Sequence, residues 1–490
     1  MACPVAWTCA EFVQLAERIR KKKVSCEEVM KAYIERCKQV NGYINAIVDD
    51  RYEAALESAK KFDEILASEA KSEDEIAKDT PLFGVPFTCK EALGIKGLLQ
   101  TSGMVRSKCH SAIEDADVVA AYKDAGAIAV TVTNVPELCM WWDTANNVFG
   151  RTKSPYGVTR SVGGSSGGEA ALITSAGALI GIGHDNLSSG RIPASFCGIY
   201  AHKPSQGCVS NYGEFPFSEM EADVTDETDI FISTGPMCRY AQDLPLLLHV
   251  LSEKHPKLQL NAKVDFRKVK LYYIEQFPGI LNSSIPSIKN AIYKAVKHFE
   301  QEYNVKAKPV SFPELKDAFS IWQCKLLEYG EPPFTFYLKG GESKRLCLWW
   351  ELCKYIVGYS EYTLPAIYYG MVQKQTKDHF YYTCLRKCKV LERKFKEILQ
   401  EEDAILLLPT HPEHPPHYLM TIPLYPSIAY TSIFNILGYP ATQIPVGVRK
   451  DLPLGIQVVS GKYKDHLTIA TAMELDKVFG GWMKPCAIID

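Results

Sequence analysis

Residues 163–183 read GGSSGGEAALITSAGALIGIG, and this stretch decides the fold class. A glycine-rich loop over 163–168 is followed by an expected helix over 169–178 and a short buried strand over 179–183. Outward from it, apolar strands are expected just before Lys90 and over 127–133, 404–409 and 456–460, and a helix over 117–126. Because strands alternate with helices, the sequence predicts a layered α/β fold.

Changes in composition, rather than linkers, divide the chain. We expect an N-terminal helical region over residues 1–75 and a single domain over 76–490. The core of that domain is expected over 80–255 and 400–485. A charged, aromatic-rich helical insertion is expected over about 255–400. The sequence shows no internal repeat and no low-complexity linker.

The composition is that of an ordinary globular protein and excludes several function classes. Hydrophobic residues make up 47% and charged residues 23% of 490 residues, with a net charge of -2. A near-neutral chain lacks the basic footprint of a nucleic-acid-binding protein, so no nucleic-acid partner is expected. The 16 cysteines form no C-x-x-C pair, and no secretory leader is visible. We therefore expect reduced thiols and a cytoplasmic location.

Three positions together predict hydrolytic chemistry. Lys90 ends an apolar strand, Ser165 lies in the glycine loop, and Ser189 follows 24 residues later. A serine hydroxyl becomes a good nucleophile only when a neighbouring base removes its proton. A buried lysine can be that base, because burial favours its neutral form.

The glycine loop has other interpretations. Gly163-x-Ser165-x-Gly167 formally matches the nucleophile elbow of α/β-hydrolases. That motif needs a strand before the serine, and the preceding residues 153–160 are turn-like. A phosphate-binding loop would need a lysine after the glycines, and none is present. A glycine loop without chemistry of its own remains a third interpretation.

Several motifs carry a specific resemblance. They are Gly84-Val-Pro86 with Lys90-Glu91, Gly163-Gly-Ser165-Ser-Gly-Gly168-Glu, Asp185 with Ser189-x-Arg191-Ile-Pro193-Ala, and Gly438-Tyr-Pro440-Ala. In this order and spacing the chain resembles the amidase signature family, and within it the fatty-acid amide hydrolases. The likeness extends from about residue 10 to the C-terminus. It implies a large twisted mixed β-sheet surrounded by helices.

The resemblance implies a role for each site residue. Ser189 would be the nucleophile, Lys90 the base, and Ser165, after a cis bond from Gly164, would pass the proton between them. The supporting residues would be Ser166, Asp185 and Arg191. The oxyanion loop would be Asn186, Leu187, Ser188 and Ser189. No metal and no organic cofactor is implied.

The oxyanion loop departs from the family pattern. Leu187 and Ser188 occupy the two positions at which the family pattern would have glycines. Glycine adopts positive φ at little cost, whereas other residues lose roughly 1–2 kcal/mol there. We therefore expect an impaired oxyanion hole, with Gly190 providing the turn one residue later. The alternative is that the strain is tolerated and the hole forms.

The resemblance also implies a lipophilic amide as the small-molecule substrate. Met140 and Trp141 are expected to line its acyl pocket. Residues 346–372 fall where fatty-acid amide hydrolases carry apolar helices. Peripheral membrane contact through this segment and ordinary helix packing both remain open, as does a homodimer.

The sequence thus favours a serine amidase that cleaves fatty-acid-type amides through a Ser-Ser-Lys triad. The alternative is a weak or inactive homologue that binds lipid amides or a protein partner. A third interpretation, the amidase-signature enzyme of a transamidosome, is disfavoured because both ends of the chain look nearer the fatty-acid amide type.

Overall fold

The computed structural model describes residues 12–216, 231–279, 283–330, 332–342 and 346–485. Within them, eleven strands form one sheet in the order β1-β3-β2-β6-β8-β7-β12-β13-β11-β9-β10. These strands are β1 (Ile47–Asp50), β2 (Pro86–Lys90), β3 (Ile128–Thr133), β6 (Ile180–Asp185), β7 (Tyr200–Lys203), β8 (Ser233–Cys238), β9 (Lys270–Tyr273), β10 (Lys308–Pro309), β11 (Ala404–Pro409), β12 (Ala441–Arg449) and β13 (Leu452–Ser460). A separate hairpin joins β4 (Ala145–Asn146) to β5 (Gly150–Arg151).

The sheet is mixed, as the resemblance implied. β2 runs parallel to both β3 and β6, whereas β6–β8, β7–β8, β7–β12 and β12–β13 are antiparallel pairs. All residues of β2, β3 and β6 are buried, as expected for strands covered on both faces. The carboxyl ends of the parallel strands β2 and β6 therefore meet at one edge of a buried sheet.

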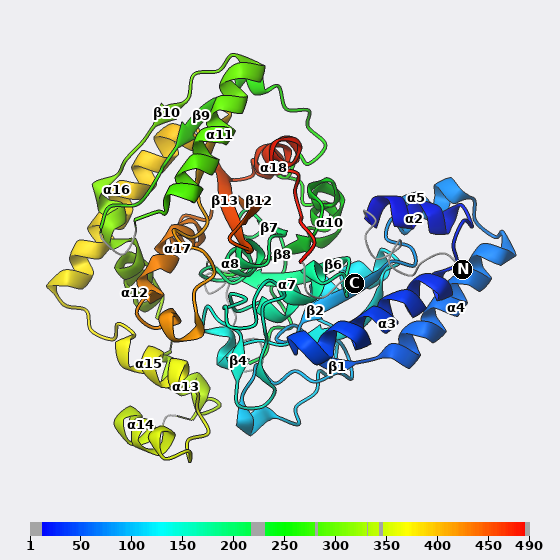
Figure 1. The fold of residues 1–490 in the computed structure, drawn as a ribbon, viewed down its shortest axis with the longest axis horizontal. Coiled ribbons are helices and arrows are strands. Elements are labelled where there is room, and N and C mark those ends of the chain that lie inside the picture. The colour runs from blue at the N-terminus through cyan, green and yellow to red at the C-terminus, as the bar shows by residue number, and fades with distance from the viewer. Residues whose placement is uncertain (1–11, 217–230, 280–282, 331, 343–345, 486–490) are drawn as a thin grey trace.

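Helices surround this sheet (Figure 1). They are α2 (Phe12–Arg20), α3 (Cys26–Ile44), α4 (Tyr52–Ser68), α5 (Glu73–Asp79), α6 (Asp117–Asp124), α7 (Gly167–Thr174), α8 (Arg191–Phe196), α10 (Leu244–Leu251), α11 (Pro286–Tyr303), α12 (Ala318–Glu328), α13 (Phe334–Leu338), α14 (Leu348–Ile356), α15 (Leu364–Val372), α16 (His379–Leu399), α17 (Ala429–Ile436) and α18 (Asp465–Phe479). The layered α/β expectation is confirmed.

The sheet extends into the segments that were expected to be helical. β1 lies within the N-terminal region and pairs with β3. β9 lies within the expected insertion and pairs in parallel with β11. The N-terminal helices and the insertion therefore flank opposite edges of one continuous sheet (Figure 1).

Two large apolar clusters stabilise this arrangement. The first joins the N-terminal helices to β2 and β3 and continues to α10, α11 and α18. The second joins α12, α16 and α17 to Trp142, Leu187 and Phe196. The loop that carries the expected nucleophile therefore packs on the second cluster.

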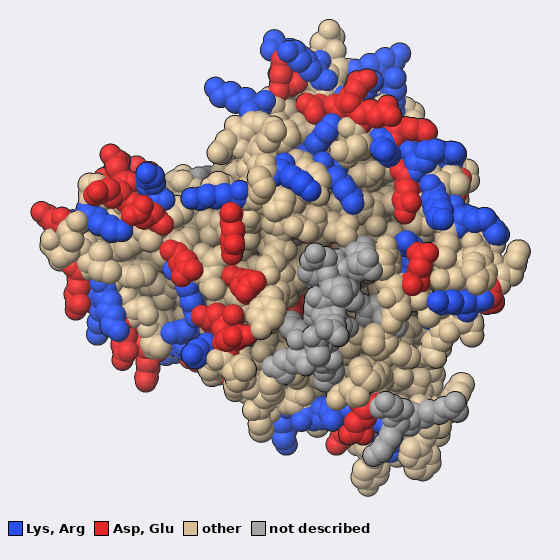
Figure 2. All heavy atoms as spheres, turned by 180° about the vertical axis from the view of Figure 1, so that it is seen from behind, with Lys and Arg blue, Asp and Glu red and all other residues tan. Residues whose placement is uncertain are grey.

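The surface carries charges of both signs. On the face shown in Figure 2, basic and acidic side chains are interspersed, and neither sign forms a continuous patch. Across the described residues, no helix is both long and apolar enough to cross a membrane.

Candidate active site

Lys90 and Ser165 meet at the carboxyl edge of β2. Lys90 is the last residue of this strand, and its Nζ lies 2.7 Å from Ser165 Oγ. Neither residue is exposed to solvent. β2 lies between β3 and β6, so it is an interior strand of the sheet. The pairing of these two expected site residues is therefore present without any ligand.

The loop before Ser165 is compact because glycine occupies two crowded positions. Gly163 has a φ of +80°, and a Cβ there would lie 2.6 Å from Pro193 Cα. A Cβ on Gly164 would lie 2.5 Å from the carbonyl oxygen of Trp141. No other residue type fits this path, which passes between α8 and the segment around Trp141. The Gly164–Ser165 bond is cis, as the resemblance implied.

Ser189 lies in the loop between β6 and α8 and is largely buried. Its carbonyl oxygen accepts a hydrogen bond from the backbone N–H of Ser166 at 3.0 Å. The side chain of Ser166 in turn lies at the end of β6, where it accepts from the backbone N–H of His184 at 3.3 Å. The structure thus joins Ser189 to the glycine loop through the main chain. Among the described residues, it shows no hydrogen bond between the hydroxyls of Ser165 and Ser189.

A buried ion pair closes the ends of the Ser189 loop. Arg191 donates from Nε to Asp185 Oδ2 at 2.9 Å and from a terminal nitrogen to Oδ1 at 3.0 Å. Burial alone would raise the pKa of Asp185, but the Arg191 guanidinium and Asn435 hold it below its usual range. Arg191 also donates to the side chains of Asn435 and Gln457. Asp185 and Arg191 therefore join the two ends of the loop.

The backbone of this loop differs from the expectation. Neither Leu187 nor Ser188 has a positive φ, and Gly190 has φ -98° and ψ -47°, a right-handed helical conformation. Gly190 therefore does not use the left-handed conformation that glycine allows. The strain predicted for Leu187 and Ser188 is absent too, because the loop reaches α8 without any left-handed residue.

The backbone donors of the loop remain available. Among the described residues, no hydrogen bond is assigned to the N–H groups of Leu187, Ser188 and Ser189. The next two N–H groups, those of Gly190 and Arg191, both donate to Asp185 Oδ2 at 3.2 Å. Unbonded N–H groups ahead of a helix suit a developing negative charge.

Sequence reasoning missed two buried residues beside Lys90. Its Nζ lies 2.9 Å from His184 Nδ1, and His184 Nε2 lies 3.1 Å from Glu214 Oε2. Both side chains are at most 3% exposed. The available signal was the position of His184, at the end of a strand and directly before Asp185. Nothing in the sequence placed Glu214 nearby.

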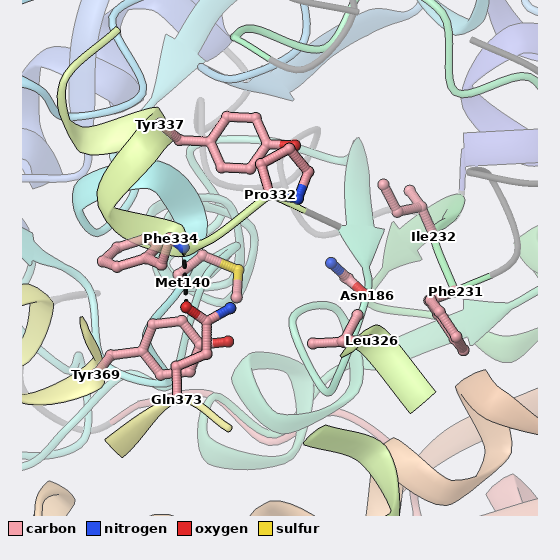
Figure 3. Close-up of a pocket in the computed structure, with 10 residues that line it drawn as sticks. All are labelled: Met140, Asn186, Phe231, Ile232, Leu326, Pro332, Phe334, Tyr337, Tyr369 and Gln373. Carbon is pink, nitrogen blue, oxygen red and sulfur yellow. Dashed lines mark hydrogen bonds between the residues drawn. The ribbon is translucent and has the colours of Figure 1, made fainter. Parts of the chain in front are cut away.

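A pocket of about 520 Å³ opens beside the loop (Figure 3). Asn186, the residue after β6, lines it together with Met140. Most of its other lining residues are apolar or aromatic and come from the segment before β8 and from α12, α13 and α15: Phe231, Ile232, Leu326, Phe334, Tyr337 and Tyr369. Met140 therefore lies in the wall of this pocket.

Trp141 occupies a different place from Met140. Its ring stacks on Tyr425 with centroids 4.6 Å apart, and it lines a neighbouring hollow of about 690 Å³ with Thr363 and Leu364. Trp141 is thus adjacent to the wall but does not line the first pocket. No group of three or more His, Cys, Asp or Glu side chains within the described ranges is arranged to hold a metal ion.

A family model described as Amidase matches residues 28–469. The chain belongs to the amidase signature family. This amidase-family chain is 39% identical over 485 residues to fatty-acid amide hydrolase 2-A of Danio rerio, covering 96% of this chain and 89% of the relative. It is 38% identical over 486 residues to fatty-acid amide hydrolase 2 of Homo sapiens, with coverage of 96% and 90%. A glutamyl-tRNA(Gln) amidotransferase component from Archaeoglobus fulgidus is 29% identical over 490 residues, with coverage of 94% and 98%.

Solved structures of the family share the fold. A fatty acid amide hydrolase matches this amidase with a TM-score of 0.77 at 21% identity, covering 99% of this chain and 87% of the other. A 6-aminohexanoate cyclic dimer hydrolase matches with a TM-score of 0.73 at 21% identity and 99% coverage of both chains. The resemblance is therefore confirmed: the chain is an amidase signature hydrolase related to fatty-acid amide hydrolase 2.

Proposed function

We propose that this chain is a serine hydrolase that cleaves fatty-acid-type amides, with Ser189 as nucleophile and Lys90 as base. The observation that carries the proposal is the buried 2.7 Å contact between Lys90 Nζ and Ser165 Oγ. It lies beside a loop in which Ser189 is fixed through its carbonyl oxygen. A neutral lysine in this position can accept a proton through Ser165.

The proposed reaction uses these groups in sequence. Lys90 accepts the proton of Ser165, which accepts the proton of Ser189 as its Oγ attacks the amide carbonyl carbon. Ser165 then returns a proton to the leaving amine, and the C–N bond breaks. Water hydrolyses the remaining ester of Ser189 with the same groups acting as base. The hydroxyls of Ser165 and Ser189 come into contact once substrate is bound, because catalytic hydrogen bonds often tighten in the complex.

The backbone N–H groups of Leu187, Ser188 and Ser189 are the proposed oxyanion donors. Their hydrogen-bonding capacity is unused among the described residues. The loop carries no positive φ at Leu187 or Ser188 that these side chains would strain. We therefore favour a working hydrolase over the alternative of an impaired homologue.

The pocket beside Asn186 suits a lipophilic acyl group. Its walls are largely apolar and aromatic, which is the usual lining of a small-molecule site. The relatives at 38–39% identity are named for fatty-acid amides. Cleavage of a long-chain amide should therefore be favoured over cleavage of a short-chain amide of the same amine.

The segment 346–372 supports peripheral contact with a membrane. In α14 the buried residue is Glu351, whereas Trp349, Trp350 and Ile356 are 72%, 63% and 75% exposed. The helix lies at the periphery, away from the sheet (Figure 1). A helix with its apolar side chains outward suits a lipid interface, and α15 beside it contributes Tyr369 to the pocket.

The test of the reaction is labelling with a fluorophosphonate probe followed by peptide mapping by mass spectrometry. We expect the adduct on Ser189. Ser189→Ala should abolish it, and the neighbouring Ser188→Ala should retain it. Lys90→Met should slow labelling and amide hydrolysis by roughly a hundred- to ten-thousand-fold. An adduct on Ser188 or Ser165 with Ser189 unmodified would overturn the assignment, as would a Lys90→Met variant with wild-type rates.

The substrate class and the membrane contact need separate measurements. The ratio of kcat/KM for oleoyl and acetyl amides of one amine tests the acyl preference, and equal values would contradict it. Sedimentation with phosphatidylcholine vesicles, compared between wild type and Trp349→Ser/Trp350→Ser, tests the lipid contact. A loss of dimer mass in that variant, without vesicle binding by the wild type, would assign the face to a homodimer.

A further inference from the structure

A buried imidazole contacts the proposed base in addition to Ser165. Lys90 Nζ lies 2.7 Å from Ser165 Oγ and 2.9 Å from His184 Nδ1. The lysine nitrogen is therefore held between one hydroxyl and one ring nitrogen, and all three residues are buried. Neither the family model nor the proposed triad gives His184 a role.

The second ring nitrogen of His184 lies close to a carboxylate. His184 Nε2 lies 3.1 Å from Glu214 Oε2, and the two side chains are 3% and 2% exposed. Glu214 lies on the segment after β7, which pairs with the chain that follows Lys90. Phe215 N–H donates to the carbonyl of Ala92 at 2.9 Å, and Gly94 N–H to that of Gly213 at 3.1 Å. The carboxylate is thus anchored to the same stretch of chain as the lysine.

The contact with Lys90 determines which ring nitrogen carries the proton. An ammonium group only donates hydrogen bonds, so His184 Nδ1, 2.9 Å from Lys90 Nζ, is the acceptor. The proton of the neutral imidazole is then on Nε2, the nitrogen near Glu214. With the opposite tautomer, an Nδ1–H would face the N–H groups of Lys90.

This arrangement orients the amine of Lys90. A neutral amine has two N–H groups and one lone pair. When one N–H is directed to His184 Nδ1, the nitrogen can turn its lone pair toward the Ser165 hydroxyl, which is the direction that proton transfer needs.

Other titratable groups near Lys90 are Cys89 and Glu91 on its own chain segment and Cys139. Burial raises the pKa of the Cys139 thiol to about 12, and burial raises the pKa of Glu91 to about 7.

We propose that His184 and Glu214 are a positioning pair that fixes the orientation of Lys90 toward Ser165. The inference rests on the proposed function, because it assigns a role only if Lys90 is the base. His184 does not touch the reacting atoms and acts through Lys90. Its loss should therefore lower kcat and leave KM nearly unchanged.

The test compares replacements that keep or remove the acceptor. His184→Ala removes it, and kcat should fall about ten- to a hundred-fold, the scale of a misplaced catalytic group. His184→Asn places a side-chain oxygen near the position of Nδ1 and should recover most of that loss. Glu214→Gln keeps the size of the side chain near His184 Nε2 and should lower kcat less than His184→Ala does, with KM nearly unchanged.

The matched control is a second buried histidine with a carboxylate partner. His202 lies on β7, with Nδ1 2.8 Å from Thr442 Oγ1 and Nε2 3.1 Å from Asp465 Oδ1, and it is 2% exposed. His202→Ala should cost comparable stability in urea unfolding. It should leave the kcat per labelled Ser189 and the pH profile of the folded fraction unchanged.

The outcomes separate this inference from the proposed function. A wild type without an adduct on Ser189, or a Lys90→Met variant with wild-type rates, would overturn the proposed function and this inference with it. If those two results are as expected, equal kcat losses in His184→Ala and His202→Ala would overturn the positioning role alone. An asparagine variant no faster than the alanine variant would do the same. If His184→Ala does not fold, His184→Leu replaces it, and a His184→Leu variant with the kcat of His184→Asn would overturn the positioning role.

Discussion

Replacement of Asp185 by asparagine tests whether the ion pair at the base of the Ser189 loop holds that loop in place. The Asp185 and Arg191 side chains are 3% and 0% exposed and make two hydrogen bonds, of 2.9 and 3.0 Å. Removing one charge of a buried pair leaves the other unpaired, which costs about 3–5 kcal/mol. The Asp185→Asn variant should therefore lose about that much free energy of unfolding at neutral pH.

The pH dependence of this loss has a defined sign. The pKa of Asp185 lies below its ordinary value in the folded protein. Its contribution to stability is therefore present above the unfolded pKa of 3.8 and is lost as the pH falls through the folded pKa. The difference between wild type and Asp185→Asn should be largest at neutral pH and should shrink when the solution is made strongly acidic.

An exposed pair with similar geometry is the control. Arg267 Nε lies 2.8 Å from Asp265 Oδ1, but the two side chains are 73% and 35% exposed. Asp265→Asn should cost less than about 1 kcal/mol. Urea unfolding followed by tryptophan fluorescence gives both values, and fluorophosphonate labelling reports the loop. A loss in Asp185→Asn no larger than in Asp265→Asn would refute the reasoning.

Burial raises the pKa of Glu169 to about 7, which destabilises the folded state by up to roughly 3 kcal/mol as the pH rises from about 4.5 to 7. Glu169→Gln should therefore flatten the decline in unfolding free energy between pH 5 and 8, and equal slopes in urea unfolding would contradict this. The double variant Leu187→Gly/Ser188→Gly should be destabilised by about 2–5 kcal/mol, because Leu187 is buried in the second apolar cluster. It should not gain in kcat/KM on an oleoyl amide, and a gain of about a hundred-fold would show that the natural loop does impair the oxyanion hole.

Local patterns predicted the elements that carry the site. The expected strand over 179–183 is β6 (Ile180–Asp185), and the expected helix over 117–126 is α6 (Asp117–Asp124). The contact between Lys90 and Ser165 was also predicted, because a glycine-rich loop and the end of a strand can be recognised from a few adjacent residues. The ends of these two elements were predicted to within two residues, and tertiary contacts fix where each one stops.

Features that depend on distant pairing were not predictable. β9 (Lys270–Tyr273) is short and partly exposed, and its sequence contains no long apolar run. It forms a strand because it pairs with the edge of β11. Glu214 lies 30 residues from His184 and reaches it through the pairing of its own segment with residues 92–94. The conformation of Leu187 was wrongly predicted because residue type indicates the cost of a positive φ, not whether the loop adopts one.

The Arg191 brace has a consequence for synthesis of the chain on the ribosome. Arg191 donates hydrogen bonds to the carbonyl of Thr431 and to the side chains of Asn435 and Gln457, which lie 240 to 266 residues downstream. A nascent chain that has left the exit tunnel only as far as β8 contains Lys90, Ser165 and Ser189 but lacks these acceptors. The buried guanidinium is then incompletely satisfied, so the loop that carries Ser189 is not fully braced until α17 and β13 have emerged. The chain would thus complete this hydrogen-bond network only near the end of its translation.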